Sequence, residues 1–515
     1  MKLIRLFDTV RHLRPVQVYS RGVLLFRRFR PLSLSRVVPD RVGPVGLEMA
    51  DSIPFPDSFR NGSFRFLNLE HHFPDRIDWE FSRYGRLWTY NLNYFEFLNQ
   101  EHLDRETGYR LIEEYISELD KRKTGLEPYP LSLRIINWIR FFIRCRISDE
   151  RFDSALYRQA DLLSRQPEYH LLANHLLENG FALLSAACYF GDKFLYAKAM
   201  RILNVQLREQ ILSDGGHFER SPMYHSLMLL RVLDCYNMVK SNGAFGREPE
   251  PLLAECSAKM AGWLEAVCFR NGDLPLVNDA ANGIAPSPAA LRAYASRLGI
   301  APTTVRLQDS GFRKLSGEKF ELLAEVGSIA PSYQPGHAHA GTFGFILYVN
   351  DRPVLVDTGT STYEIGDTRS YERGTAAHNT VVVDDLDSSE VWASHRVGRR
   401  ARVRLLRDTP SSVEAAHDGY GKQAGLHTRA FESEGGTLRI RDRIDGTGIA
   451  YLHFAPQEHV VQEGDAIVGS DYTISFRGAA RIESFTTLYS PEFNRRIRRI
   501  SFRIRFSGRL ETMIA

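Results

Sequence analysis

The chain has 515 residues, of which 43% are hydrophobic and 25% charged, and its formal net charge at pH 7 is +4. This length exceeds one hydrophobic core of ordinary size, so we expect two or three domains. The composition is that of a globular protein and excludes a mainly disordered chain, and the nearly balanced charge excludes a dedicated nucleic-acid-binding protein.

Residues 1–64 form a basic N-terminal arm. Residues 1–37 contain nine lysines and arginines and one acid, Asp8, which gives this stretch a charge of +8 and leaves −4 for the rest. Arginines interrupt every apolar run, so the stretch lacks the core of a secretory signal, and we expect a cytoplasmic protein. No segment approaches the roughly 18 apolar residues of a membrane span. A basic, partly amphipathic arm could touch an anionic membrane surface, although a packed or solvated arm is the more common outcome.

The cysteines lie in the first 268 residues, without Cys-x-x-Cys spacing. Scattered cysteines are typical of buried thiols in a reducing compartment, and they predict neither a disulfide framework nor a cysteine metal site. They are Cys145, Cys188, Cys235, Cys256 and Cys268.

Residues 65–305 have the apolar spacing of helices. Apolar residues recur at i, i+3, i+4 and i+7, with glycine near helix ends, in SLRIINWIRFFIRCRI, YHLLANHLLENGFALLSAACYFG and MYHSLMLLRVLDCYNMVKSNG. Several such helices in series predict an all-α domain.

Residues 306–515 change to a period of two, which is typical of strands. The segments that alternate or run apolar are FGFILYVN, PVLVDTG, NTVVVDD, ARVRLLRD, TLRIRDRIDG, YTISFRG and RIRRISFRIRF. Turn signals lie at residues 350–351, 435–436 and 445–446. The pattern predicts an antiparallel β domain, and a site fed by both halves would lie at their junction.

Two polar residues interrupt a predicted helix. Asn174 and His175 lie in the middle of the apolar pattern of YHLLANHLLENG. A buried polar group needs hydrogen-bond partners, and a satisfied core amide is as common as a functional one. Both interpretations stay open.

A tyrosine lies at the predicted start of the helix MYHSLMLL. Ser221 is a good N-cap and Pro222 a good first helical residue, which places Tyr224 in the first turn. The positive end of the helix, with Arg220 close by, would help to stabilise a phenolate, whose pKa is ordinarily about 10. Tyr224 is therefore a candidate proton carrier, and the alternative is a tyrosine that only packs under its helix.

The stretch GHAHAGTFGF places two histidines two residues apart, just before a predicted strand. On a regular strand His337 and His339 would point to one side. The following hairpin would bring Asp357 opposite about Gly344, so the chain before residue 342 must fold back for His339 to reach Asp357. With His378 these residues make a His/Asp/His set suitable for zinc, and the alternative is a pair of half-exposed loop histidines.

These motifs together resemble a known family. NHLLENG, DGGHFERSPMYH, GHAHAGTFGF with PVLVDTGTSTY, and ERGTAAHNTV look like the successive motifs of the heparinase II/III family of polysaccharide lyases, with related motifs in alginate lyases of similar build. The resemblance covers roughly residues 85 to 400. It implies an incomplete (α/α) toroid followed by an antiparallel β-sandwich, and β-elimination at a uronic acid of an acidic polysaccharide.

The resemblance also implies roles for individual residues. Asn174, aided by His175, would stabilise the enolate-like state at the substrate carboxylate. Tyr224 and His337 would divide the proton transfers at C5 and O4, and which of them is the base stays open. The candidate substrate contacts are Arg220, Glu219 and Arg373.

Members of the family that contain a metal hold a structural zinc, and matching the motifs puts its ligands at His339, Asp357 and His378. His337 would then face the substrate while zinc holds its neighbour, so the loop must be irregular. The chain departs from the family at Gly341, where relatives commonly have an acidic residue, and this glycine could loosen the loop. Secreted lyases carry a signal sequence, so its absence favours processing or biosynthesis of a polysaccharide in the cytoplasm.

Two other functions stay open. A glycoside hydrolase needs two carboxylates roughly 5 to 9.5 Å apart, and Glu219 and Asp279 are the candidates. A non-catalytic polysaccharide-binding protein would present basic strands such as RVGRRARVRLLR and RRIRRISFRIRF to an acidic glycan. Alternating arginines on a strand, however, most often form its solvated face.

Overall fold

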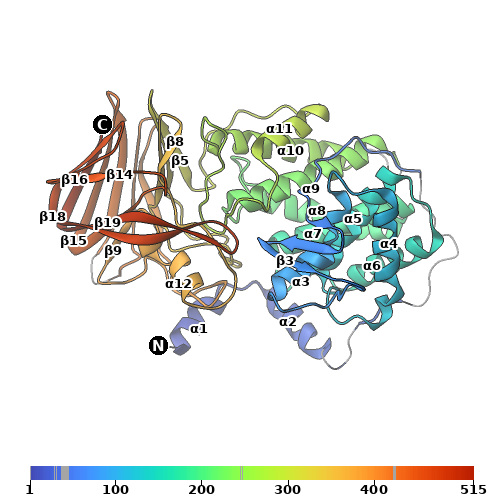
Figure 1. The fold of residues 1–515 in the computed structure, drawn as a ribbon. Helices are drawn as coiled ribbons and strands as arrows, with labels where there is room; N and C mark the ends of the chain where they lie inside the picture. The colour runs from blue at the N-terminus through green and yellow to red at the C-terminus, as the bar shows by residue number, and fades with distance from the viewer. Residues whose placement is uncertain are drawn as a thin grey trace.

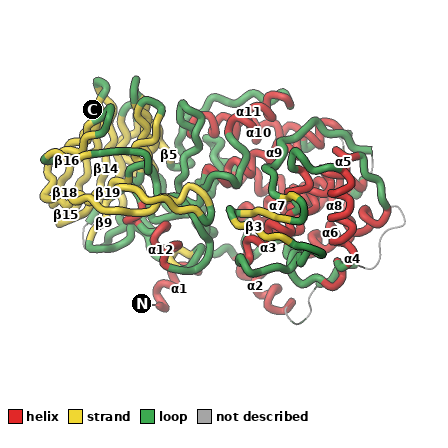
Figure 2. Tube along the Cα trace, in the orientation of Figure 1, coloured by secondary structure: helices red, strands yellow, loops and turns green. Residues whose placement is uncertain are grey.

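The helical half and the sheet half of the chain lie beside each other (Figure 1). The computed structural model describes residues 2–27, 29, 32–35, 46–243, 245, 248–421 and 425–515. Helices dominate residues 86–297, and strands dominate the chain from residue 312 onward (Figure 2). The two periods of the sequence therefore correspond to two differently built halves, as predicted.

The helical half is an incomplete (α/α) toroid. Its helices are α3 (Arg86–Tyr94), α4 (Arg105–Ser117), α5 (Pro128–Cys145), α6 (Glu150–Arg165), α7 (Ala173–Phe190), α8 (Lys193–Gln210), α9 (Pro222–Ser241), α10 (Glu250–Val267) and α11 (Pro288–Arg297), with short 3₁₀ turns η1 (Glu96–Asn99) and η2 (Leu119–Lys121). α3, α5, α7, α9 and α11 contact one another in turn as an inner series, while α4, α6 and α8 form an outer series. The inner helices are apolar on nearly every face because helices cover them on both sides.

Local sequence signals start several of these helices. Ser221 accepts a hydrogen bond from the backbone N–H of Tyr224, and Pro222 is the first residue of α9, as predicted. Side chains that accept from a first-turn N–H in the same way are Asp104, Asp149, Asp192 and Ser287.

The sheet half contains strands β5 (Phe312–Ser316), β6 (Phe320–Glu325), β7 (Phe345–Val349), β8 (Arg352–Leu355), β9 (Val381–Val383), β10 (Val391–Trp392), β11 (Arg396–Val397), β12 (Val403–Asp408), β13 (Ser412–His417), β14 (His427–Glu434), β15 (Thr437–His453), β16 (Val461–Glu463), β17 (Ala466–Val468), β18 (Thr473–Glu492) and β19 (Arg495–Ile514). It also contains helix α12 (Asp367–Arg373) and the turn η3 (Thr375–Ala377). All seven segments predicted as strands contain one.

These strands form an antiparallel β-sandwich. One sheet has the order β12-β13-β14-β15-β19-β18-β17-β16, with β9 paired to β15, and the other has the order β5-β6-β7-β8. Leu322 and Leu347 of the small sheet share one buried cluster with Ile440 and Ile504 of the large sheet. The apolar faces of the two sheets therefore cover each other.

Two of the predicted turns are confirmed and one is wrong. Residues 350–351 have positive φ angles and close the hairpin of β7 and β8, and residues 435–436 close that of β14 and β15. Residues 445–446 instead lie inside β15, where its pairing with β19 shifts register. Gly446, with φ 95, permits this irregularity in a strand that continues beyond it.

The N-terminal arm touches both halves. α1 (Lys2–Val10) lies under the sheet half, where Thr9 accepts a hydrogen bond from the Trp392 indole at 3.1 Å (Figure 1). α2 (Pro15–Arg27) lies on the helical half, where Gln17 donates to the Leu171 carbonyl at 3.2 Å. A small sheet of β1 (Phe59–Arg60), β2 (Ser63–Phe66) and β3 (Leu69–His72) follows, so it crosses the division at residue 64.

The described helices include none with the length and hydrophobicity needed to cross a bilayer. All five cysteines are free thiols, and only Cys145 is not fully buried. The prediction of scattered thiols without a disulfide framework is therefore confirmed.

Candidate active site

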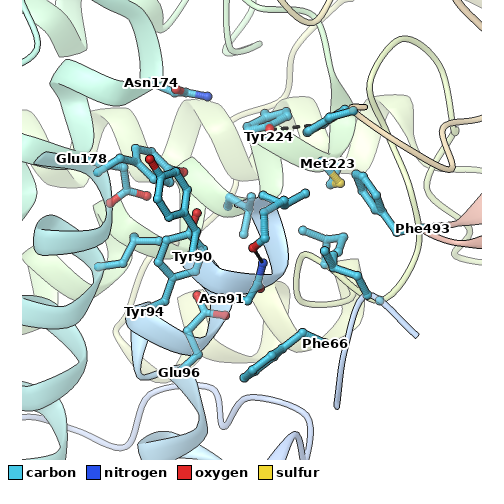
Figure 3. Close-up of a pocket in the computed structure, with 18 of the residues that line it drawn as sticks. Phe66, Tyr90, Asn91, Tyr94, Glu96, Asn174, Glu178, Met223, Tyr224 and Phe493 are labelled. Carbon is cyan, nitrogen blue, oxygen red and sulfur yellow. Dashed lines mark hydrogen bonds between the residues drawn. The ribbon is translucent and has the colours of Figure 1, made fainter. Parts of the chain in front are cut away.

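A cleft of about 660 Å³ lies between the ends of the inner helices and the loops of the sheet half (Figure 3). Its helical wall comes from α3, α5, α7 and α9, and its other wall comes from loops around His337, Tyr363 and His395. The predicted site residues on this cleft are Asn174, His175, Glu219, Tyr224 and His337.

Asn174 and His175 lie in the first turn of α7, which corrects their expected position in mid-helix. The amide of Asn174 donates to Glu219 Oε2 at 3.1 Å, and its backbone N–H donates to Oε1 at 3.2 Å. Among the described residues, no group pairs with the buried Oδ1 of Asn174. The positive end of α7 and the second hydrogen of the Asn174 amide nitrogen thus meet at the cleft and would stabilise an anion, whereas the unpaired Oδ1 can only accept a hydrogen bond.

His175 lies next to Asn174 and is held by a carboxylate. Its Nδ1 lies 3.3 Å from Glu168, and its ring packs on Tyr129 with centroids 4.6 Å apart. Although burial opposes charge on the ring, Glu168 raises the pKa of His175. The protonated form is therefore favoured, which adds positive charge to this part of the cleft.

Tyr224 and His337 are stacked against each other. Their ring centroids are 3.9 Å apart, and the planes meet at 29°. The Tyr224 hydroxyl lies 3.2 Å from the Tyr363 hydroxyl (Figure 3). Burial raises the pKa of Tyr224, so its phenol is neutral at pH 7.

A buried carboxylate fixes the orientation of His337. Asp279 Oδ2 lies 3.0 Å from His337 Nδ1, and Asp279 Oδ1 lies 2.9 Å from His339 Nε2. Arg369 donates to the same carboxylate at 2.7 Å. Burial opposes its charge, but Arg369 and the two histidines hold the pKa of Asp279 well below its usual value. Asp279 therefore accepts the Nδ1 proton of His337 and leaves Nε2 as a hydrogen-bond acceptor.

Two arginines expected to contact substrate do not line the cleft. Arg220 donates to the carbonyls of Ser328 and Asp309, and Arg373 donates to the Ala338 carbonyl at 3.0 Å. The prediction that Arg220 and Arg373 contact the substrate is therefore wrong. Arg220 also does not stabilise a Tyr224 phenolate, because its side chain points to these carbonyls. Both guanidiniums therefore brace backbone carbonyls away from the cleft.

The loop that carries both histidines is irregular, as predicted. β7 begins only at Phe345, Phe343 has φ 66, and the Gly344 N–H donates to the Gly341 carbonyl at 2.7 Å. This reversal leaves His337 on the cleft and buries His339, which is 1% exposed. The two neighbouring histidines therefore face different surroundings.

His339, Asp357 and His378 lie together beneath the cleft. Their potential ligand atoms are all within 4.8 Å of one another, and all three residues are buried. His339 Nδ1 and His378 Nε2 have no hydrogen-bond partner within the described chain. Two imidazole nitrogens without partners beside a carboxylate fit a cation, and these three residues lie together as the sequence predicted.

Gly341 packs against this cluster. A Cβ atom at this position would lie 3.2 Å from the His378 ring, which is a tight contact. The absence of a side chain thus lets the loop approach His378 closely. The sequence interpretation, in which Gly341 loosens the loop, does not agree with this packing.

Comparison with known proteins places these features in a family. The model "Heparinase II/III N-terminus" matches residues 137–302, and "Heparinase II/III-like, C-terminal" matches residues 300–514. The chain belongs to the heparinase II/III family. It is a polysaccharide lyase, and the resemblance seen in its motifs is confirmed.

Solved structures of heparinases have the same fold as this lyase. A structure titled heparinase III is 15% identical to this chain. The aligned region covers 96% of this chain and 89% of the heparinase III chain, with a TM-score of 0.66. A mutant of the heparan sulfate lyase HepC from Pedobacter heparinus is 17% identical to this chain. The aligned region covers 97% of this chain and 88% of the HepC chain, with a TM-score of 0.60. No curated protein sequence matches the chain.

Some residues of the lyase site were not predicted from the sequence. Tyr363 and His395 line the cleft, and Arg369 binds Asp279 beneath it. Tyr363 lies at the end of PVLVDTGTSTY, so its motif was a usable signal. Arg369 and His395 lie outside the motifs and are brought in only by the packing of α12 and the following loop.

The rival interpretations find less support at this site. Asp279 is 0% exposed and fully engaged by Arg369 and the histidines, so it does not form an accessible pair with Glu219 as a hydrolase would require. The basic strand β19 carries outward arginines, and Arg505 is paired with Glu483 of β18 at 3.4 Å. Such pairs are typical of a solvated face.

Proposed function

We propose that this lyase cleaves a polysaccharide at a uronic acid by β-elimination. The stacked pair of Tyr224 and His337, beside the incompletely paired amide of Asn174, carries this proposal. The pair offers a neutral phenol and an oriented imidazole at one place. These are the acid and the base that an elimination needs.

The substrate carboxylate must be neutralised before C5 gives up its proton, because the departing proton leaves a second negative charge beside it. Asn174, His175 and the positive end of α7 supply donors and positive charge there. One such donor is typically worth about 3 to 4 kcal/mol. Burial raises the pKa of Glu219, so this carboxyl can take up a proton when an anionic substrate approaches.

We propose His337 as the base and Tyr224 as the acid. His337 Nε2 would take the C5 proton, the C5–H electron pair would form the C4–C5 double bond, and the C4–O4 bond would break. The Tyr224 hydroxyl would protonate the leaving O4. Support comes from the Nδ1 contact with Asp279, which makes Nε2 the acceptor nitrogen of the neutral ring, and from the raised pKa of Tyr224.

Substitution of Tyr224 tests the activity. We expect wild-type protein to release products that absorb in the near ultraviolet from a polymer in a panel of uronate-containing polysaccharides. Tyr224→Phe should lower kcat/KM by about 10²- to 10⁴-fold with an unchanged melting temperature. The matched control is Tyr109→Phe, which removes a phenol paired with Asp149 outside the cleft. New reducing ends without the chromophore would contradict elimination and indicate hydrolysis.

We also propose that the cation beneath the cleft is zinc. Two imidazoles and one carboxylate form a donor set that zinc accepts. His339, Asp357 and His378 would hold it, and its charge would tie the histidine loop to η3 and the end of β8. Metal analysis should find one zinc per chain, and His378→Ala should remove it and lower the melting temperature. A calcium ion, or wild-type protein without metal, would contradict zinc.

We propose, finally, that the lyase acts in cytoplasmic polysaccharide processing, with its arm on the inner membrane surface. The apolar side chains of Leu3, Phe7 and Phe26 are 82%, 61% and 63% exposed on α1 and α2. The basic residue Arg11 follows α1 directly, and Arg21 lies on α2. Apolar and basic groups together suit an anionic bilayer.

Sedimentation with vesicles tests the arm. Wild-type protein should co-sediment with vesicles of phosphatidylcholine and phosphatidylglycerol, and Leu3→Ser/Phe7→Ser should not. Val461→Ser, at a strand position that is 62% exposed, is the control. Equal partitioning of all three proteins would contradict membrane contact, and fractionation of cells that express the native chain would test the location.

A further inference from the structure

The charges that line the cleft are unusual for a site that accepts an acidic polymer. Its described lining contains two arginines, Arg65 and Arg231, and no lysine. The carboxylates on the same lining are Asp57, Glu96, Glu178, Glu219 and Glu492. Recognition of sulfate normally uses arginine or lysine donors, so this excess of acids argues against a heavily sulfated substrate.

The buried arginine has no spare charge. Arg231 is 2% exposed, and its Nε lies 3.2 Å from Glu178 while its Nη2 lies 3.6 Å from Glu96. Two carboxylates thus surround one guanidinium. Glu178 and Glu96 lie at the end of the cleft away from Phe493 of the sheet half (Figure 3). The other arginine, Arg65, is exposed at the rim. The far end therefore has no free positive charge to pair with a sulfate group.

Polar atoms at this end still lack partners. Glu178 is 2% exposed, and among the described residues nothing pairs with its Oε2 or with Nη1 of Arg231. One is an acceptor and the other a donor, which together match a hydroxyl group. Burial also raises the pKa of Tyr94 and Tyr129, so the nearby phenols are neutral. This end presents hydrogen-bonding groups and aromatic surface to a sugar ring.

We infer that the substrate is an unsulfated polysaccharide in which the uronate is followed by an uncharged sugar, whose hydroxyls bind Glu178 and Arg231. This inference rests on the proposed elimination at a uronate. Asn174 and His175 then handle the single carboxylate of the uronate, while the Glu96–Arg231–Glu178 cluster selects against a charged neighbour. The cleft recognises low charge density along the chain as well as the uronate itself.

A pair of matched polymers tests the selection. The probes are an unsulfated uronate–N-acetylhexosamine polymer and the same polymer after chemical sulfation. Wild-type kcat/KM should favour the unsulfated form by about tenfold or more, since burying a sulfate at the far end removes it from water without a free positive charge to pair with it. Glu96→Gln/Glu178→Gln removes both of these negative charges from around Arg231 and frees its positive charge, so it should reduce or reverse this preference. The control is Glu113→Gln, which removes an exposed carboxylate paired with Arg151 on the outer helices.

Binding to an inactive variant separates this inference from the reaction. Tyr224→Phe should bind oligosaccharides of the unsulfated polymer more tightly than sulfated ones, and calorimetry reads this without turnover. Tighter binding of the sulfated form, or binding of neither, would overturn the inference. Preferential binding by this variant, without unsaturated products from wild-type protein on either polymer, would support the selection and overturn the proposed elimination.

Discussion

Two buried carboxylates, one under each end of the cleft, differ in how completely they are paired. Asp279, under the sheet-side end, is contacted by Arg369, His337 and His339 through both of its oxygens. Glu178, at the helical end, shares Arg231 with Glu96 and keeps one oxygen without a partner in the described structure. Both are buried, yet only Asp279 is fully satisfied.

The difference separates positioning from binding. A fully paired buried charge has no capacity left for a ligand, so Asp279 orients the two histidines and holds their loop. A partly paired one carries an unmet desolvation penalty that a ligand can relieve, so Glu178 is suited to contact a sugar. Substitution of each carboxylate in turn tests this difference.

The largest expected effect follows from Asp279→Asn. This change leaves Arg369 buried without a counter-ion, so we expect the free energy of unfolding to fall by about 3 to 5 kcal/mol. Glu178→Gln should cost less than about 2 kcal/mol, because Arg231 keeps Glu96 and the amide oxygen can still accept. Denaturant unfolding measures both variants, and equal losses would contradict the distinction.

An intermediate effect is expected at Arg373. Its guanidinium holds the carbonyl of Ala338, the residue between the two histidines. Arg373→Met should lower kcat by about 10- to 100-fold with little change in KM, because the histidine loop shifts while the rest of the cleft stays intact. Arg134→Met is a matched control, since Arg134 is also buried and braces backbone carbonyls, those of Asn93 and Gly125, in the helical half. An equal loss in both variants would indicate a general structural effect.

The smallest effect concerns the pH dependence of stability at Glu178. Burial raises the pKa of Glu178 above its unfolded value, so the native state binds the proton more tightly than the unfolded state. Its contribution to stability is therefore fully present below the unfolded pKa and is lost as the pH rises through the folded pKa. The stability that Glu178→Gln loses relative to wild type should therefore shrink as the pH rises above the ordinary glutamate pKa of about 4.3. Melting temperatures across this range measure the difference, and the opposite slope would mean that Glu178 is fully paired after all.

Much of the site was visible in the chain because its motifs are local. Ser221 and Pro222 set the start of α9 through backbone chemistry that acts within one helical turn, so the placement of Tyr224 could be predicted. The resemblance of the motifs to a family supplied the His339, Asp357 and His378 cluster. Arg220 and Arg373 were misassigned because a sequence shows an arginine but not the carbonyls that its side chain reaches.

The sequence by itself determined the two halves, since apolar periods of 3.6 and 2 residues reflect which face of each helix or strand must be buried. Only the tertiary structure decided that Asp279 lies under His337, that Asn174 and His175 lie in the first turn of α7, and that Glu178 and Glu96 share one arginine. Asp279 and His337 are 58 positions apart in the sequence, and Glu178 and Arg231 are 53 positions apart. Their contacts depend on how the elements pack, which no local pattern encodes. The physical reason is that buried charges pair according to their distance in space, whereas the apolar period depends only on residues close together in the sequence.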